Sequence, residues 1–315
     1  MKQYDLIIIG AGPAGLSAGI YAGRAMLNAL IIEQGQDGGQ ILQTAEIENY
    51  PGSELEESGA TLIDRMSAQV KKFGIEKVYD TVKEVSLEGK IKTVLCDRES
   101  YQAKTVIIAG GATAKPIGCI GEDEFRGRGI SFCGTCDAPF FKGLHVYVVG
   151  GGDAALEEAI YLTKFARKVT IIHRRRVLRA AKSIQEKAFN NEKIDFMYHT
   201  VIKEVKGDGL LESMILENVK DGSITEIKAD PNDGTFGIFV FIGYNPATEI
   251  YRGKLNLNEK GYIITDEDMK TNIEGVFAAG DIREKSLRQV ITAAADGAIA
   301  AVQAGKYIEE TEQSV

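Results

Sequence analysis

The chain of 315 residues is long enough for about two domains. Its 44% hydrophobic and 26% charged residues are ordinary values for a globular protein with a substantial core. The formal net charge of −8 argues against general nucleic-acid binding and against an anionic membrane surface, because both would repel an acidic protein.

The apolar runs, such as 6–9 and 239–242, are far shorter than the roughly 20 residues of a membrane span. The first residues lead directly into a strand and a turn, without the basic region or cleavage site of a signal peptide. We therefore expect a cytoplasmic protein. In a reducing cytosol, a close pair among the four cysteines is expected to be catalytic or metal-binding rather than a structural disulfide.

An internal repeat organises the chain. Each copy consists of an apolar strand, a glycine-rich turn, a helix and a second strand. The first copy has these at 6–9, 10–15, 13–26 and 29–32, and the second at 146–149, 150–155, 154–165 and 168–172. Each turn matches G-x-G-x-x-G/A, which in this context predicts a dinucleotide-binding βαβ unit. The alternative is a pair of ordinary tight turns in an α/β sheet.

The three small positions of this fingerprint have distinct tasks. The first glycine permits the tight turn, and the second lets the backbone approach a pyrophosphate. The third position, Gly15 or Ala155, lets the helix pack closely on the strand. The helix start then offers free N–H groups and the positive end of its dipole to the anion.

The ends of the second strands distinguish the two ligands. Glu33 and His173 lie at the same offset from the first glycine of their copies (33 − 10 and 173 − 150). A carboxylate there accepts hydrogen bonds from ribose hydroxyls and repels a 2′-phosphate. The second copy instead has a histidine and four arginines, His173, Arg174, Arg175, Arg176 and Arg179. Because arginine suits bidentate phosphate binding, the first site predicts FAD and the second NADPH. A solvated surface turn is the alternative for the arginine run.

The second repeat lies between two glycine-containing exits from apolar strands, 110–112 and 243–246. Such paired linkers predict an inserted domain that is reached by two chain crossings. A strand that ends at Gly280 and Asp281, and an alanine-rich helix at 288–307, are assigned to the first domain. The predicted fold is α/β, with two Rossmann-like nucleotide-binding domains, the second inserted into the first. Residues 1–114 and 244–315 form the FAD domain, and 115–243 the NADPH domain.

Cys133 and Cys136 form a C-x-x-C motif ahead of the second fingerprint, and Asp137 follows. The spacing lets both sulfurs meet at a helix start, which favours the reactive thiolate. Asp137 can exchange a proton with the dithiol. Half of a zinc site is the alternative, but Cys96, Cys119 and the scattered histidines do not supply a second ligand pair, so no metal is predicted.

Two nucleotide sites and one dithiol imply that electrons pass from NADPH to the flavin, then to the disulfide, and then to an external disulfide by thiol exchange. Three other functions compete with this interpretation. One is a flavin-dependent reductase that uses a ferredoxin or another thiol protein. Another is a non-catalytic flavin redox sensor. The third is a peroxide-system disulfide reductase, which normally carries an added thioredoxin-like domain.

Segments 10–15, 38–40, 47–52, 133–137, 150–155, 173–179 and 280–281 resemble, in order, those of the low-molecular-weight bacterial thioredoxin reductases, and the resemblance covers essentially the whole chain. It implies that FAD is held by Gly10, Gly12, Pro13, Ala14, Gly15, Glu33, Gln40, Asn49, Gly280, Asp281, Arg288 and Gln289. It implies that NADPH is held by Gly150, Gly152, Asp153, Ala154, His173, Arg174, Arg175 and Arg179. Arg176 stands at a position that varies in the family and receives no role.

The resemblance further implies that Cys136 faces the flavin, that Cys133 attacks thioredoxin or a thioredoxin-like protein, and that Asp137 is the acid. It implies a cytoplasmic homodimer. It also implies a rotation of the inserted domain, since one small dithiol cannot face a buried flavin and a protein substrate at once. Ala138 and Pro139 depart from the family pattern, in which a glycine after the acid is more usual, and this change can alter the helix start.

Overall fold

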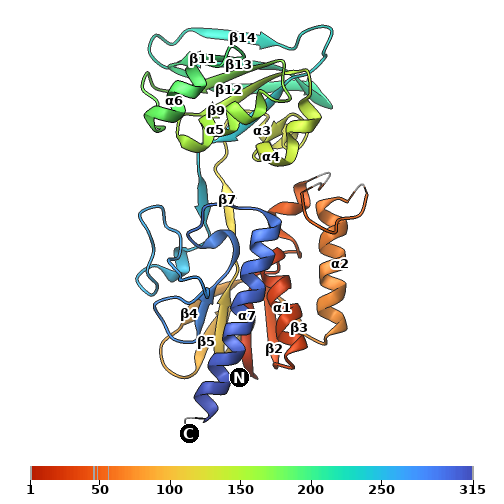
Figure 1. Cartoon of the computed structure of the whole chain (residues 1–315), viewed down its shortest axis with the longest axis vertical. Coiled ribbons are helices and arrows are strands. Elements are labelled where there is room, and N and C mark those ends of the chain that lie inside the picture. The colour runs from red at the N-terminus through yellow and green to blue at the C-terminus, as the bar shows by residue number, and fades with distance from the viewer. Residues whose placement is uncertain (1, 45–46, 48, 56, 314–315) are drawn as a thin grey trace. The chain divides into compact units, whose positions relative to one another are not determined.

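The computed structural model describes residues 2–44, 47, 49–55 and 57–313 (Figure 1). The chain forms two compact units: a first unit of Met1–Thr113 with Asn245–Val315, and an inserted unit of Ala114–Tyr244. Each unit contains a sheet of parallel strands with helices packed on it. The predicted α/β class, with one Rossmann-like fold inserted into another, is therefore confirmed.

The first unit begins with a βαβ motif and ends with a long helix. Its elements are β1 (Lys2–Ile9), α1 (Pro13–Arg24), β2 (Ala29–Glu33), η1 (Gly39–Gln43), α2 (Gly59–Lys72), β3 (Glu76–Tyr79), β4 (Val82–Ser86), β5 (Lys92–Cys96), β6 (Ser100–Ile108), η3 (Glu249–Tyr251), β17 (Val276–Ala278), η4 (Gly280–Ile282) and α7 (Val290–Gln313). The strand order is β3-β2-β1-β6-β5-β4, with β17 also paired to β6. Strands β3, β2, β1, β6 and β17 are parallel, and β5 and β4 add an antiparallel edge.

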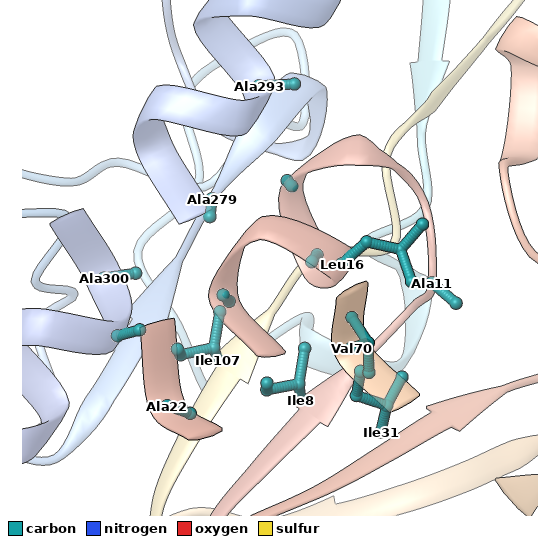
Figure 2. Close-up of a cluster of buried hydrophobic side chains, with 14 of the residues drawn as sticks. Ile8, Ala11, Leu16, Ala22, Ile31, Val70, Ile107, Ala279, Ala293 and Ala300 are labelled. Carbon is teal, nitrogen blue, oxygen red and sulfur yellow. The ribbon is translucent and has the colours of Figure 1, made fainter. Parts of the chain in front are cut away.

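The core of the first unit lies where α1, α2 and α7 pack on this sheet. Figure 2 shows Ile8 of β1, Ile31 of β2, Leu16 of α1 and Val70 of α2 pointing into one buried cluster, and Ala300 brings α7 to it. From Leu6 to Ile9 the side chains of β1 are buried on both faces of the sheet, as is usual for a central parallel strand. The small residues of α1 and α7 allow these two helices to approach closely.

The inserted unit repeats the plan of the first. Its elements are α3 (Glu122–Phe125), β8 (Ile130–Ser131), α4 (Gly134–Asp137), η2 (Ala138–Phe141), β9 (His145–Gly150), α5 (Asp153–Leu162), β10 (Lys168–His173), α6 (Lys182–Phe189), β11 (Ile194–Tyr198), β12 (Thr200–Asp208), β13 (Leu210–Asn218), β14 (Ile224–Lys228) and β15 (Gly237–Phe241). A parallel sheet runs in the order β11-β10-β9-β15-β8, and β12-β13-β14 form an antiparallel sheet.

Both predicted strand–turn–helix–strand repeats are present, as β1-α1-β2 and β9-α5-β10. The helices end earlier than predicted, because local turns stop them. After α1, Met26 adopts a left-handed φ of 57°. After α5, the N–H groups of Phe165 and Ala166 both bond back to Leu162 at 3.0 and 2.9 Å. The C-terminal helix begins two residues later than predicted and extends to Gln313.

The third position of the fingerprint has no room for a methyl group in the first copy but accommodates one in the second. A methyl group at Gly15 would overlap the carbonyl oxygen of Gly10, which is rigid backbone. In the second copy Ala155 is fully buried, and its methyl group lies where a side chain at Gly150 would otherwise point. The two turns therefore reach the same shape with the small residue in different places.

We expect Gly15→Ala to destabilise the first unit by about 3 kcal/mol, because the helix must move away from the turn. Ala155→Gly is the matched change in the other copy. It removes one buried methyl group and loosens the helix, at a cost of about 1–2 kcal/mol. Chemical denaturation of both variants measures the difference, and equal losses would contradict the steric explanation.

The two chain crossings between the units are short strands, β7 (Ala112–Ala114) and β16 (Tyr244–Pro246), which pair with each other. They overlap the glycine-containing segments 110–112 and 243–246 that the sequence indicated as linkers. Within the described ranges, no helix is both long enough and apolar enough to cross a membrane.

Candidate active site

The first fingerprint forms the turn between β1 and α1. Gly12 is the N-cap of α1 and Pro13 its first residue, and no side chain caps this end. The first N–H groups of the helix have no partner within the helix, and they coincide with the positive end of its dipole. The predicted residues Gly10, Gly12, Pro13, Ala14 and Gly15 therefore lie together in an arrangement that suits a pyrophosphate.

Glu33 is the last residue of β2, and the backbone holds its carboxylate in place. Its Oε2 accepts the N–H of Ala11 at 2.7 Å, and its Oε1 accepts the N–H of Gly35 at 3.0 Å. Each oxygen keeps a second lone pair. The carboxylate is thus oriented beside the fingerprint and can still accept hydrogen bonds from ribose hydroxyls.

Gly280 and Asp281 join this site from the far end of the sequence. A Cβ on Gly280 would lie 2.9 Å from that of Ala14, so η4 touches the first turn of α1. Oδ1 of Asp281 is buried and, among the described residues, has no hydrogen-bond partner. Burial raises the pKa of Asp281, while the charges of Lys285 and Arg288 oppose the rise. A hydroxyl-rich ligand such as FAD fits this orphaned acceptor beside a helix N-terminus.

A buried charge cluster, which the sequence did not reveal, supports Asp281. Asp296 of α7 accepts hydrogen bonds at one carboxylate oxygen from Gly280 N at 3.0 Å, Lys285 Nζ at 2.8 Å and Arg283 Nη1 at 3.3 Å. The side chains of Lys285 and Asp296 are only 7% and 9% exposed. The cluster fixes the main chain at Gly280 and includes Lys285, one of the two cations whose charge acts on the carboxyl of Asp281.

We expect Asp296→Asn to lower the free energy of unfolding by about 3–5 kcal/mol, because two buried cations lose their carboxylate. Asp268→Asn is the control. Its exposed carboxylate pairs with Lys270 at 3.2 Å, and such surface pairs contribute about 1 kcal/mol or less. Denaturant unfolding of both variants tests this, and a loss at Asp296 no larger than at Asp268 would disprove the cluster's role.

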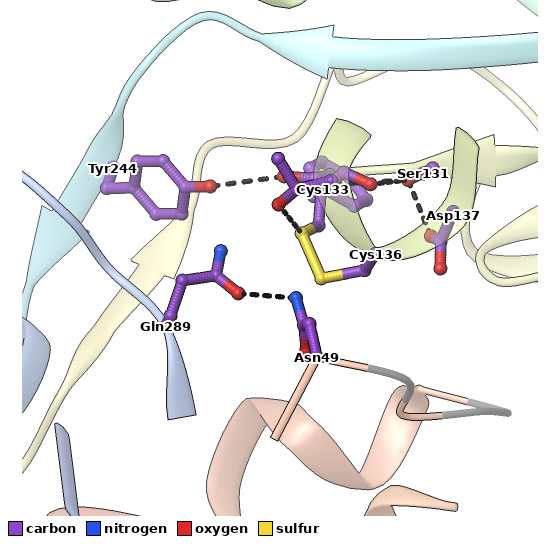
Figure 3. Close-up of a disulfide and its surroundings, with 9 residues drawn as sticks. Asn49, Ser131, Cys133, Cys136, Asp137, Tyr244 and Gln289 are labelled. Carbon is purple, nitrogen blue, oxygen red and sulfur yellow. Dashed lines mark hydrogen bonds between the residues drawn. A yellow bond between two sulfur atoms is a disulfide. The ribbon is translucent and has the colours of Figure 1, made fainter. Parts of the chain in front are cut away.

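The remaining residues predicted for FAD lie in η1 and in loops of the first unit. Gln40 Nε2 donates to the carbonyl of Ala112. Asn49 Nδ2 donates to Oε1 of Gln289 at 3.0 Å, which joins two segments far apart in the sequence (Figure 3). The guanidinium of Arg288 stacks on the ring of Tyr262 at 4.2 Å. In the sequence segment 47–52, residue 48 lies outside the described residues.

The second fingerprint forms the turn between β9 and α5. Gly152 is the N-cap of α5, and no side chain caps this end either. Asp153, the first helical residue, instead accepts the N–H of Ala181 at 2.7 Å. This bond ties the fingerprint to the segment that precedes α6. Gly150, Gly152, Asp153 and Ala154 thus form a second helix start with free N–H groups.

The segment 173–179, here called the arginine loop, is folded against the second fingerprint. The carbonyl of Gly151 accepts the N–H of Arg179 at 2.6 Å. The ring of His173 packs on Gly151, with Nε2 3.2 Å from the carbonyl of Val177. Burial lowers the pKa of His173. Arg174, Arg175 and Arg179 are exposed, as anion-binding side chains at this edge would be.

Cys133 and Cys136 form a disulfide, with their Cα atoms 5.3 Å apart (Figure 3). Cys133 is the N-cap of α4, which is only one turn long, and Pro139 lies in the 3₁₀ helix that follows. Ser131 Oγ accepts the N–H of Cys133 at 3.1 Å and bonds Asp137 Oδ2 at 2.6 Å. Burial raises the pKa of Asp137. The disulfide therefore has a partly buried carboxyl in the same turn that can carry a proton.

Cys96 and Cys119 are unpaired thiols away from this motif, and burial raises the pKa of each to about 11. His145 bonds Thr170 at 2.9 Å within the inserted unit. In the part of the chain that the structure describes, no three His, Cys, Asp or Glu side chains gather as a metal site requires.

The chain has two dinucleotide-binding folds, and the inserted unit also contains a disulfide of the redox-active type. These features define a disulfide oxidoreductase that uses two nucleotide cofactors. The family model of the pyridine nucleotide-disulphide oxidoreductases matches residues 4–297, and the chain belongs to this family.

Particular relatives narrow this class. The chain is 59% identical over 306 residues to a thioredoxin reductase of Peptoclostridium acidaminophilum, with 97% of each protein covered. It is similar to the crystal structure of thioredoxin reductase from Streptococcus pyogenes MGAS5005, with 45% identity, a TM-score of 0.91, and 98% and 99% of the two chains covered. For Lactococcus lactis thioredoxin reductase, titled as the FR conformation, the identity is 42%, the coverage the same and the TM-score 0.66.

Proposed function

We propose that the protein is an NADPH-dependent thioredoxin-disulfide reductase that carries FAD and passes electrons through Cys133 and Cys136 to the disulfide of thioredoxin. One observation carries this proposal: the disulfide lies in the same unit as a dinucleotide turn that is joined to an arginine loop. The relative that is 59% identical over nearly the whole chain is itself named a thioredoxin reductase.

Residues of the first unit hold FAD. The N–H groups at the start of α1 bind the pyrophosphate, and Glu33 accepts hydrogen bonds from ribose. The orphaned oxygen of Asp281, with Gly280 beside it, accepts a hydroxyl of the cofactor. Gln40, Asn49, Arg288 and Gln289 complete the site, as the family resemblance implies. FAD, when bound, supplies the two-electron centre between NADPH and the disulfide.

Residues of the inserted unit hold NADPH. The turn of Gly150, Gly152, Asp153 and Ala154 binds the pyrophosphate at the start of α5. Arg174, Arg175 and Arg179 bind the 2′-phosphate, because three guanidinium groups supply charge-assisted hydrogen bonds to its oxygens. His173 contributes by holding the arginine loop against Gly151.

The dithiol reduces thioredoxin by thiol–disulfide exchange. Cys133, as a thiolate, attacks one sulfur of the thioredoxin disulfide, and the other sulfur leaves with the electron pair. Cys136 then attacks Cys133, which restores the intramolecular disulfide and releases reduced thioredoxin. Asp137, whose raised pKa favours proton transfer, exchanges a proton with the dithiol.

The FAD domain comprises 1–114 and 244–315, and the NADPH domain comprises 115–243. The compact units support this division, since their boundaries fall within one residue of these limits. The protein acts in the cytoplasm as a homodimer. Support for a dimer comes from α7, which leaves Ile291, Ile299 and Val302 exposed on one helical face. The net charge of −8 supports the lack of nucleic-acid and membrane partners.

The inserted domain rotates during the cycle, so that the disulfide serves the flavin and thioredoxin in turn. Two thioredoxin reductases of nearly equal identity give TM-scores of 0.91 and 0.66, as relatives solved in different domain arrangements would. Labels at the exposed residues Lys90 and Lys220, one in each unit, measure the motion in solution. We expect the label distance to change on reduction in the presence of NADP⁺. A single unchanged distance would contradict the rotation.

Steady-state NADPH oxidation with and without a bacterial thioredoxin tests the proposed function. We expect a rate that rises with thioredoxin concentration and saturates. If NADPH reduces the flavin but thioredoxin adds nothing, another disulfide or electron-carrier protein is the acceptor. If no acceptor sustains turnover, a flavin redox sensor becomes the better interpretation.

A further inference from the structure

A second carboxyl contacts the C-x-x-C turn from a neighbouring helix. Glu158 lies on α5, and a methyl group on Gly134 would overlap its Oε2 and come within 3.0 Å of its Cδ. Gly134 stands directly after Cys133 in the motif. The absence of a side chain at this position is therefore what makes room for the carboxyl.

Glu158 is partly buried, and one of its carboxyl oxygens is unsatisfied. Within the described part of the chain, Oε2 of Glu158 is shielded from solvent and has no hydrogen-bond partner. Burial raises the pKa of Glu158, and the charge of Glu157 adds to the rise. On β15, the side chain that faces Gly134 is the apolar ring of Phe241, 3.6 Å from the same methyl position. On α4 itself, the ionisable side chain is that of Asp137, which is bonded to Ser131.

A poorly solvated charge beside a dithiol affects its two redox states unequally. Reduction breaks the S–S bond and leaves one electron pair more on the two sulfurs, which then bind one or two protons. At a pH above the pKa of Glu158, its carboxylate repels a thiolate on either sulfur through a medium of low dielectric constant. The disulfide form carries no charge and feels no such repulsion. A stabilised thiolate lowers the free energy of the dithiol form relative to the disulfide, and the pair is then a weaker reductant.

We propose that Glu158 keeps the Cys133/Cys136 pair strongly reducing, because its carboxylate opposes a thiolate in the adjacent turn. It is a positioning residue that acts on the charge of the sulfurs, and it is distinct from Asp137, which carries the proton. The inference rests on the proposed role of the pair as electron donor to a protein disulfide. Gly134 has a complementary role, because its lack of a side chain keeps the carboxyl in contact with the motif.

The test uses Glu158→Gln, which keeps the size of the side chain and removes its charge. The purified flavoprotein is equilibrated with glutathione redox buffers, and the dithiol fraction is read by alkylation and mass spectrometry. We expect the equilibrium to move toward the dithiol by about tenfold, the effect of removing one nearby like charge. The pH at which the reduced enzyme reaches half its maximal alkylation rate should fall as well. Glu158→Asp should keep most of the wild-type behaviour.

Glu157→Gln is the matched control, because this glutamate is exposed on the same helix. We expect it to change the equilibrium by less than about twofold, owing to solvent screening. Gly134→Ala, which displaces the carboxyl, should resemble Glu158→Gln and add nothing in a Glu158→Ala background. An alkylation profile of Glu158→Gln that superimposes on that of wild type, or of Glu157→Gln, would overturn the proposal. Neither NADPH nor thioredoxin enters these measurements, so failure here is distinguishable from failure of the proposed function.

Discussion

Replacing either Cys133 or Cys136 by serine is expected to lower thioredoxin-dependent NADPH oxidation by roughly a thousandfold or more, because a hydroxyl cannot take part in disulfide exchange at neutral pH. Each variant should still bind FAD, since every residue proposed to hold it lies in the first unit. Each should also still accept hydride equivalents from NADPH in a single turnover. Stopped-flow absorbance of the flavin, beside the steady-state assay, separates these two outcomes.

Cys119→Ser is the control for this experiment. Cys119 is an unpaired thiol in the same unit, and burial raises its pKa to about 11, which makes it a poor nucleophile. We expect its turnover to match wild type. Thioredoxin-dependent turnover that survives in either Cys133→Ser or Cys136→Ser would mean that electrons leave the flavin by another route.

Removing the positive charges of the arginine loop should lower the ratio of kcat/KM for NADPH to kcat/KM for NADH toward one. Each charge-assisted hydrogen bond to a phosphate contributes about 1.5–3 kcal/mol, which is roughly 10- to 100-fold in binding. Arg174→Ala and Arg175→Ala should therefore each lower kcat/KM for NADPH by about that factor, while kcat/KM for NADH changes little. Steady-state kinetics with both nucleotides give the ratio directly.

Arg176→Ala provides the matched control, because this arginine is an exposed neighbour in the same loop with no assigned role. We expect it to change the NADPH to NADH ratio by less than about threefold, as a screened surface charge does. Equal losses with both nucleotides at Arg174 or Arg175 would show that the loop has been deformed. The 2′-phosphate assignment would then fail.

The features that sequence reasoning predicted well are those set by local pattern. Glu33 and His173 were matched by counting from the first glycine, and both are the last residue of their strands. Counting succeeds here because a βαβ unit has a nearly fixed length between the turn and the end of the second strand. The inserted architecture was predictable for a related reason: the second fingerprint falls between two glycine-containing linkers.

The features that sequence reasoning missed depend on partners distant along the chain. Asp296 reads as one acid in an alanine-rich helix, and its bonds to Gly280 and Lys285 exist only once α7 has packed beside η4. Glu158 reads as a surface glutamate of an amphipathic helix, yet tertiary packing buries it against Gly134. The contact between the ring of His173 and the loop backbone was likewise not readable from the sequence. Periodicity and spacing carry no information on such contacts.

The discontinuity of the first unit also fixes the order in which a nascent chain can fold. The inserted unit is a single stretch that ends at Tyr244, so all its strands have been synthesised while the C-terminal segment is still on the ribosome. The first unit cannot complete its sheet until β17 pairs with β6, and α1, which already packs on α2, lacks its contacts with α7 until that helix is made. Until then the apolar surface of α1 and β6 is uncovered, which exposes it to chaperones and to aggregation. In truncated chains that end before α7, we therefore expect the inserted unit to be folded and the first unit to be incompletely folded.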